Sequence, residues 1–193
     1  MKLIFLDCET TGLDPATNAM IQVAGIVEID GEVVEEFYIN CRPLKGDFIN
    51  ADALAVNGVT MEDLRGYPSG SESLVSLKRI FDKYIDKYNK KDKFYLVAQN
   101  AQFDYDFLKF FFVKHNDHYF GSYIHYHKID LIAITTVMKL AGVLDVPNMK
   151  LATIMEKLGL GKQTHDALDD VRALRKVFQI YLSWVKRAVP PLG

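Results

Sequence analysis

The sequence has few cysteines and no long apolar run, and each lack excludes a class of protein. Two cysteines, Cys8 and Cys41, in 193 residues exclude a disulfide-stabilised secreted scaffold. No run reaches the roughly 18 apolar residues of a membrane span, and Asp7 and Glu9 interrupt the apolar start before it reaches the length of a signal peptide. We therefore expect a cytoplasmic protein with reduced thiols and no membrane contact.

The sequence also lacks a strong net charge. Its 23 basic and 25 acidic residues give −2 at pH 7, which excludes a protein that coats nucleic acid through bulk positive charge. The net charge does not exclude a small acidic site that binds phosphate through metal ions. Length and composition predict a single domain over residues 1–187, followed by a short tail, 188–193, in which Pro190 and Pro191 stop the last helix.

The pattern of apolar runs predicts an α/β fold. Residues 2–7 form a short apolar run, and residues 20–29 and 33–41 flank Asp30-Gly31, a strong hairpin signal, so three antiparallel strands come first. A further strand is expected at 94–98. Helices are expected at 71–88, from about Asp104, and at 129–141, 149–158 and 165–185. We predict a mixed central sheet with three leading antiparallel strands, flanked by helices.

Two carboxylates end the first strand. Asp7 and Glu9 are two residues apart, so on an extended strand they project to the same face. Burying such a repelling pair is costly unless a cation compensates it, and hard oxygen ligands suit Mg²⁺ or Mn²⁺ better than Zn²⁺. The alternative is a strand tip whose acids cap neighbouring amides.

Two further polar groups follow later elements. Asn100 and Asp104 come after the strand at 94–98, although Asp104 alone could be a helix N-cap. His165 and Asp170 are five residues apart, about 140° around a helix, so both face one site only if His165 lies at or before the helix start.

The three groups together carry a family resemblance. FLDCETTGLDP, QNAQFD and HDALDD, in this order, resemble the three motifs of the DnaQ-like 3′→5′ exonucleases of the DEDDh branch. Between them, VNGVTMEDL and Ile129-Asp130-Leu131 resemble further segments of that family. The resemblance covers nearly the whole chain and implies a ribonuclease H-like fold. Asn57 and Gln22 depart from the histidine and glutamate common in the family, which puts substrate details in question.

The resemblance implies the reaction and the roles of individual residues. It implies hydrolysis from the 3′ end of single-stranded DNA or RNA, with DNA favoured, to nucleoside 5′-monophosphates. The implied ligands of two divalent ions, Mg²⁺ or Mn²⁺, are Asp7, Glu9, Asp104 and Asp170; His165 is the implied general base, and Asp169 has no role. The implied substrate-binding residues are Thr10, Gly12, Leu13, Asn57, Asn100 and Phe103, although Phe103 also suits the core. A stand-alone nuclease and a proofreading subunit bound to a DNA polymerase both stay open.

Two other functions are alternatives to an exonuclease. A haloacid-dehalogenase phosphatase also opens with an apolar strand ending in FLD, but it would need aspartate at Glu9 and leaves Asp104 and His165 without a role. A non-catalytic nucleic-acid-binding or scaffold protein on the same fold would not need all five candidate catalytic residues. A metal-dependent cleavage assay separates this last possibility from an enzyme.

Overall fold

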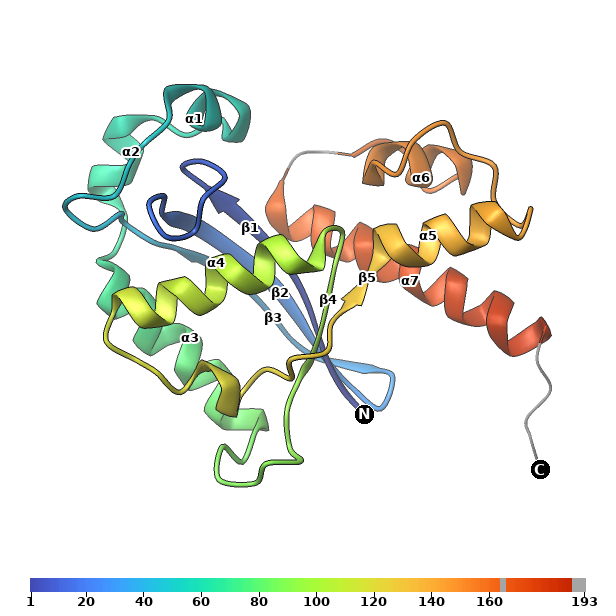
Figure 1. Ribbon diagram of the computed structural model, residues 1–193, viewed down its shortest axis with the longest axis horizontal. Coiled ribbons are helices and arrows are strands. Elements are labelled where there is room, and N and C mark those ends of the chain that lie inside the picture. The colour runs from blue at the N-terminus through green and yellow to red at the C-terminus, as the bar shows by residue number, and fades with distance from the viewer. Residues whose placement is uncertain (164–165, 189–193) are drawn as a thin grey trace.

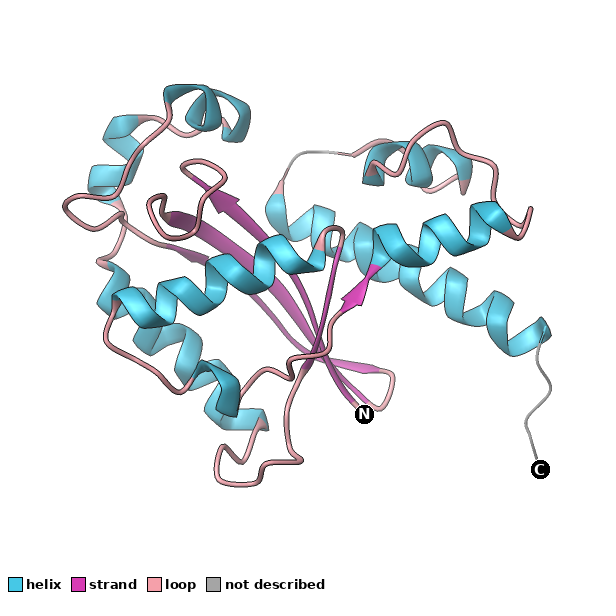
Figure 2. Ribbon diagram, viewed as in Figure 1, coloured by secondary structure: helices cyan, strands magenta, loops and turns pink. Residues whose placement is uncertain are grey.

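A mixed sheet forms the centre of the computed structural model, which describes residues 1–163 and 166–188 (Figures 1 and 2). Its strands are β1 (Lys2–Thr10), β2 (Met20–Ile29), β3 (Glu32–Asn40), β4 (Tyr95–Ala98) and β5 (Ile129–Asp130). They lie in the order β3-β2-β1-β4-β5; β2 is antiparallel to β1 and β3, whereas β4 and β5 continue the sheet in parallel. The predicted mixed sheet with three leading antiparallel strands is confirmed.

The hairpin between β2 and β3 turns at the predicted dipeptide. Asp30 and Gly31 have φ values of 52° and 94°, the left-handed conformations that a two-residue hairpin turn requires. The ladder between β1 and β2 pairs Asp7 with Ala24 and Glu9 with Gln22. Because side chains alternate along a strand, this register places both carboxylates on one face and Cys8 on the other.

Helices cover both faces of the sheet. They are α1 (Ala51–Asn57), α2 (Met61–Gly66), α3 (Gly70–Tyr84), α4 (Ala101–Lys114), α5 (Leu131–Leu140), α6 (Leu151–Lys157) and α7 (Ala167–Ala188), with a short 3₁₀ turn at Phe120–Ser122. One core lies between the sheet and α3 and α4, and a second lies between the other face and α5, α6 and α7. Figure 1 shows α5, α6 and α7 grouped on one side of the molecule and α1, α2 and α3 on the other.

Several predicted helix boundaries were wrong, including the end of the last helix, which was predicted at 185 and lies at Ala188. The helix predicted at 71–88 ends at Tyr84, where Asp86 begins a turn by accepting the backbone N–H of Tyr88 at 3.1 Å. The helix predicted near Asp104 begins three residues earlier, at Ala101. The helix predicted at 129–141 begins at Leu131, because residues 129–130 pair with β4 as a strand.

The described ranges contain no helix that is both long enough and apolar enough to cross a membrane. The two cysteines are free and buried, as expected for reduced core thiols. Burial raises the pKa of Cys41 to about 12, so its thiol is protonated at neutral pH. The predicted domain limits, 1–187 and 188–193, stay predictions.

Candidate active site

Four carboxylates from three elements converge at one end of the sheet. Asp7 and Glu9 come from β1, Asp104 from the first turn of α4 and Asp170 from the first turn of α7. Asp104 and Asp170 are only 4% and 8% exposed. Asp104 Oδ1 accepts a hydrogen bond of 3.0 Å from the backbone N–H of Cys8, which lies between the two acids of β1. Acids about a hundred residues apart in sequence are thereby held together.

Burial and mutual repulsion govern the charge of this cluster. The pKa of Asp7 lies well above its ordinary value, first because of burial and then because of repulsion by Asp104, Glu9 and Asp170. Burial raises the pKa of Asp104 to about 7, although the hydrogen bond from the Cys8 backbone N–H opposes the shift. Without a compensating cation, the cluster therefore retains protons at pH values where isolated carboxylates are ionised.

The donor set fits a hard divalent cation in its chemistry. It consists of carboxylate oxygens, the ligands that Mg²⁺ and Mn²⁺ prefer, and a cation would relieve the repulsion that raises the pKa of Asp7. In the described part of the chain, no three acidic, histidine or cysteine side chains are already arranged to hold one ion. Asp104 is turned toward Cys8, and Asp170 Oδ2 accepts from Gln163 Nε2 at 2.6 Å. Asp104 and Asp170 thus each use one carboxylate oxygen for a hydrogen bond within the protein.

The third motif places its two consecutive aspartates differently. Asp170 is buried and close enough to Asp7 to raise its pKa. Asp169 Oδ1 forms an ion pair of 2.8 Å with Arg172 Nη1, and both side chains are almost half exposed. This arrangement supports Asp170, and not Asp169, as the member of the acidic cluster. His165 lies outside the described residues.

The predicted substrate segment begins at Thr10, the last residue of β1. Thr10 is buried, and its hydroxyl donates to the backbone oxygen of Gly12 at 2.6 Å, whereas the Leu13 side chain is 85% exposed. Asn57 reaches this segment from the end of α1, where its Nδ2 donates to the backbone oxygen of Thr10 at 2.9 Å. A Cβ atom on Gly12 would lie 2.4 Å from Asn18 Nδ2, so the protein's own packing already requires glycine at this position.

The predicted residues of the second motif lie at the start of α4. Asn100 is exposed and occupies the N-cap position without a side-chain capping bond. The Phe103 ring is half-buried and lies 4.7 Å, centroid to centroid, from Phe107, so it packs against the core.

Two supporting residues were missed by the sequence reasoning on the site. Asp130 Oδ2 accepts from the backbone N–H of Ala101 at 3.1 Å, which fixes the start of α4, while its Oδ1 caps α5 through Ile132 at 2.8 Å. Its place in the segment 129–131, which already resembled the family, was the available signal. Gln163, beside Asp170, had no comparable signal.

A polar extension of the acidic face was also missed. Gln22, opposite Glu9 in the ladder, donates from Nε2 to the Tyr67 hydroxyl at 2.9 Å. Burial raises the pKa of Tyr38, as do the nearby Tyr67, Asp166 and Glu9 in smaller measure. Gln22 was noted in the sequence only as a departure from the family, and Tyr38 and Tyr67 had no signal there.

Comparison with known proteins shows the family of the chain. A family model described as "Exonuclease" matches residues 4–178. The chain belongs to this exonuclease family. It is 30% identical over 185 residues, or 95% of its length, to a PolC-type DNA polymerase III of Thermotoga petrophila. It is 29% identical over 190 residues to a ribonuclease T of Buchnera aphidicola subsp. Baizongia pistaciae, covering 91% of this chain and 81% of that protein.

Solved structures show the fold. The zinc-bound complex of E. coli exonuclease I with single-stranded DNA superposes with a TM-score of 0.79 at 20% identity, over 99% of this chain and 41% of that one. The predicted ribonuclease H-like fold is thus confirmed. The chain spans only 12% of the length of the PolC-type polymerase from Thermotoga petrophila.

Proposed function

We propose that this chain is a metal-dependent 3′→5′ exonuclease that removes nucleoside 5′-monophosphates from single-stranded nucleic acid. The main support is the convergence of four carboxylates from β1, α4 and α7 in a member of the exonuclease family. Neither a phosphatase of the haloacid-dehalogenase type nor a scaffold accounts for that convergence.

The acidic cluster is proposed to bind the catalytic cations. Asp7, Glu9, Asp104 and Asp170 would hold two divalent ions, Mg²⁺ or Mn²⁺. Bound there, the ions would neutralise charge that develops on the phosphate and lower the pKa of a bound water. The raised pKa of Asp7 implies that metal binding displaces protons, so metal affinity should increase with pH.

His165 is proposed to be the general base. In its neutral form an imidazole can take the proton of the attacking water, and its sequence position before Asp170 would bring it to the same cluster. Its role rests on the third motif alone.

The segment after β1 is proposed to hold the terminal nucleotide. Backbone amides of Thr10 and Gly12 would approach the nucleotide, and the exposed Leu13 side chain would lie against its base. Asn57 would act through its bond to the Thr10 carbonyl group, and Asn100 and Phe103 would border the same pocket. Apolar and aromatic contacts accept any base, so we expect little base specificity.

DNA is the proposed preferred substrate, and a DNA polymerase is a proposed partner. The alignment of 95% of this chain with a PolC-type polymerase supports both, and the exonuclease I complex shows single-stranded DNA on the same fold. The ribonuclease T relative supports RNA as the competing substrate. We keep a cytoplasmic location as a prediction, based on the two reduced thiols.

One digestion experiment tests the reaction. Matched single-stranded DNA and RNA, labelled at the 3′ or the 5′ end, would be incubated with Mg²⁺, Mn²⁺ or a chelator. We expect labelled mononucleotides to appear first from the 3′-labelled strands, only with metal, and no cleavage of closed circular strands. Equal cleavage of circular strands would show an endonuclease and contradict the proposal.

A further inference from the structure

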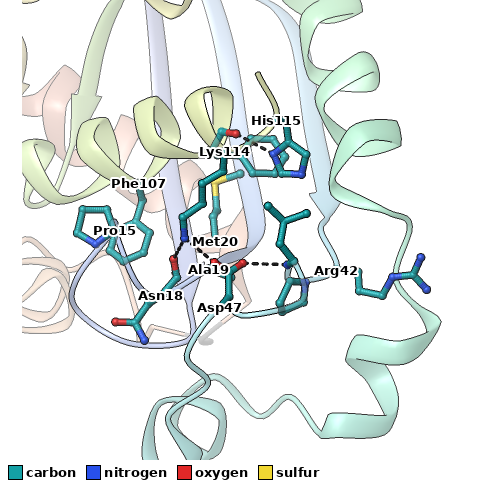
Figure 3. A pocket seen from close by; sticks show the side chains of 12 residues that line it. Pro15, Asn18, Ala19, Met20, Arg42, Asp47, Phe107, Lys114 and His115 are labelled. Atoms are coloured by element: carbon teal, nitrogen blue, oxygen red, sulfur yellow. Dashed lines mark hydrogen bonds and ion pairs between the residues drawn. The ribbon is translucent and has the colours of Figure 1, made fainter. Parts of the chain in front are cut away.

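A part-buried ion pair lies beside the segment that follows β1. Lys114 is the last residue of α4, and its Nζ donates to Asp47 Oδ1 and to the backbone oxygen of Asn18, both at 2.6 Å (Figure 3). The Lys114 and Asp47 side chains are 17% and 9% exposed. Both charges are thus largely removed from water and depend on each other.

The surroundings leave little room for solvent to replace either partner. The cavity beside the pair has a volume of about 10 Å³, the lower limit for one water molecule. Phe107 and Phe111 of α4 form one wall. If Lys114 lost its ammonium group, Asp47 would be left as a buried charge without its cation, and Asn18 would lose a hydrogen bond.

Asn18 connects Lys114 to the proposed substrate segment. Its Nδ2 donates to the backbone oxygen of Thr11 at 3.2 Å and to that of Phe48 at 2.8 Å, and its Oδ1 accepts from the Asp14 backbone N–H at 3.1 Å. Gly12 packs directly against the same amide. A displacement of Asn18 would therefore move residues 11–14.

A second loop is tied into the same network. The other oxygen of Asp47 accepts from the Leu44 backbone N–H at 2.9 Å, which fixes the turn before Phe48. The Thr11 hydroxyl donates to the Phe48 backbone oxygen at 2.8 Å, and the Thr11 backbone oxygen accepts from the Asn50 N–H at 2.9 Å. Lys114 thus contacts both loops that define the position of Thr11.

We propose that Lys114 is a positioning residue for the 3′-terminal nucleotide, an inference that rests on the proposed exonuclease function. One rigid helix, α4, carries Asp104 in its first turn and Lys114 at its end. The acid and the substrate segment are thereby held at a fixed separation. The Lys114 side chain is only 17% exposed and is paired with Asp47, so it acts through Asn18 and not as a phosphate ligand.

The test compares Lys114→Met, the double variant Lys114→Met/Asp47→Asn, and Lys78→Met. The double variant removes the unpaired buried charge, and its asparagine can still accept from the Leu44 N–H, but it does not restore the bond to Asn18. Lys78 is a matched control, because it forms another part-buried ion pair, with Asp117, away from the substrate segment. Melting temperature, oligonucleotide KM and kcat, and hydrogen exchange at Thr11, Ala19 and Asn50 would be measured for each protein.

Lys114→Met should raise KM about tenfold with little change in kcat, since a displaced positioning group weakens binding of the terminal nucleotide. The double variant should recover melting temperature but keep the raised KM and the faster exchange. Lys78→Met should keep the wild-type KM.

Two results would overturn the inference: an unchanged KM in Lys114→Met, or a KM that recovers together with stability in the double variant. Failure of the wild-type protein to cleave 3′ ends in the same assay would overturn the proposed function, and this inference with it. The wild-type control therefore distinguishes the two failures.

Discussion

The backbone N–H of Cys8 donates to Asp104 Oδ1 at 3.0 Å, across 96 residues of sequence. The bond ties the first turn of α4 to the middle of the acidic stretch of β1. It also lowers the pKa of Asp104, but burial outweighs it and raises that pKa to about 7. The hydrogen bond therefore favours the ionised form of Asp104, but it does not fully offset the effect of burial on this carboxylate.

The raised pKa of Asp104 predicts how stability depends on pH in a chelator. An acid whose pKa is higher in the folded state than the roughly 3.9 of an unfolded chain contributes stability at low pH, which is lost as pH rises through the folded value. Between pH 4 and about 7, Asp104 should therefore reduce stability as pH increases. Asp104→Asn should flatten this part of the profile, as measured by calorimetry of both proteins in EDTA. Parallel profiles would contradict the assigned shift.

Two neighbouring aspartates give a test of the third motif. Asp170→Ala should reduce cleavage below detection without loss of the folded state, because it removes a proposed metal ligand and one source of repulsion on Asp7. Asp169→Ala should retain most activity, since Asp169 pairs with Arg172 at the surface and such pairs contribute little. Turnover and thermal unfolding would be measured for both. An inactive Asp169→Ala beside an active Asp170→Ala would reverse the assignment.

His165→Ala separates proton transfer from metal binding. The four carboxylates remain, so Mn²⁺ affinity should change little, whereas the single-turnover rate should fall by roughly 10²- to 10⁴-fold, the usual contribution of a general base. The wild-type rate should rise with pH as the imidazole loses its proton, and the variant should lack that rise. Unchanged cleavage, or lost metal binding in a folded variant, would remove His165 from the role of base.

Gly12→Ala tests the packing behind the substrate segment. Its new Cβ would lie 2.4 Å from Asn18 Nδ2, so we expect destabilisation of about 1–3 kcal/mol from overpacking, together with a raised KM. Gly121→Ala is the control, because nothing lies within 4 Å of a Cβ atom there. Denaturant unfolding and oligonucleotide kinetics would measure both effects. Equal stability of the two variants would show that Asn18 moves without cost.

Four of the five strands and the candidate acids could be predicted from the order of residues, whereas β5 could not. Apolar runs on either side of Asp30-Gly31 are enough to define the hairpin, since such a turn needs residues that tolerate left-handed conformations. The spacing of Asp7 and Glu9 places them on one face of any strand. These features depend on local geometry, which the order of residues specifies directly.

How the separate motifs meet depends on contacts between distant segments. The start of α4 at Ala101 depends on Asp130, 29 residues away, and the pairing of Lys114 with Asp47 spans 67 residues. No local pattern marks either contact, because each exists only after the sheet has brought distant segments together. The raised pKa of Asp7 also depends on tertiary structure. The sequence shows that Asp7 lies two residues from Glu9, but the burial of Asp7 and the approach of Asp104 and Asp170 result from packing.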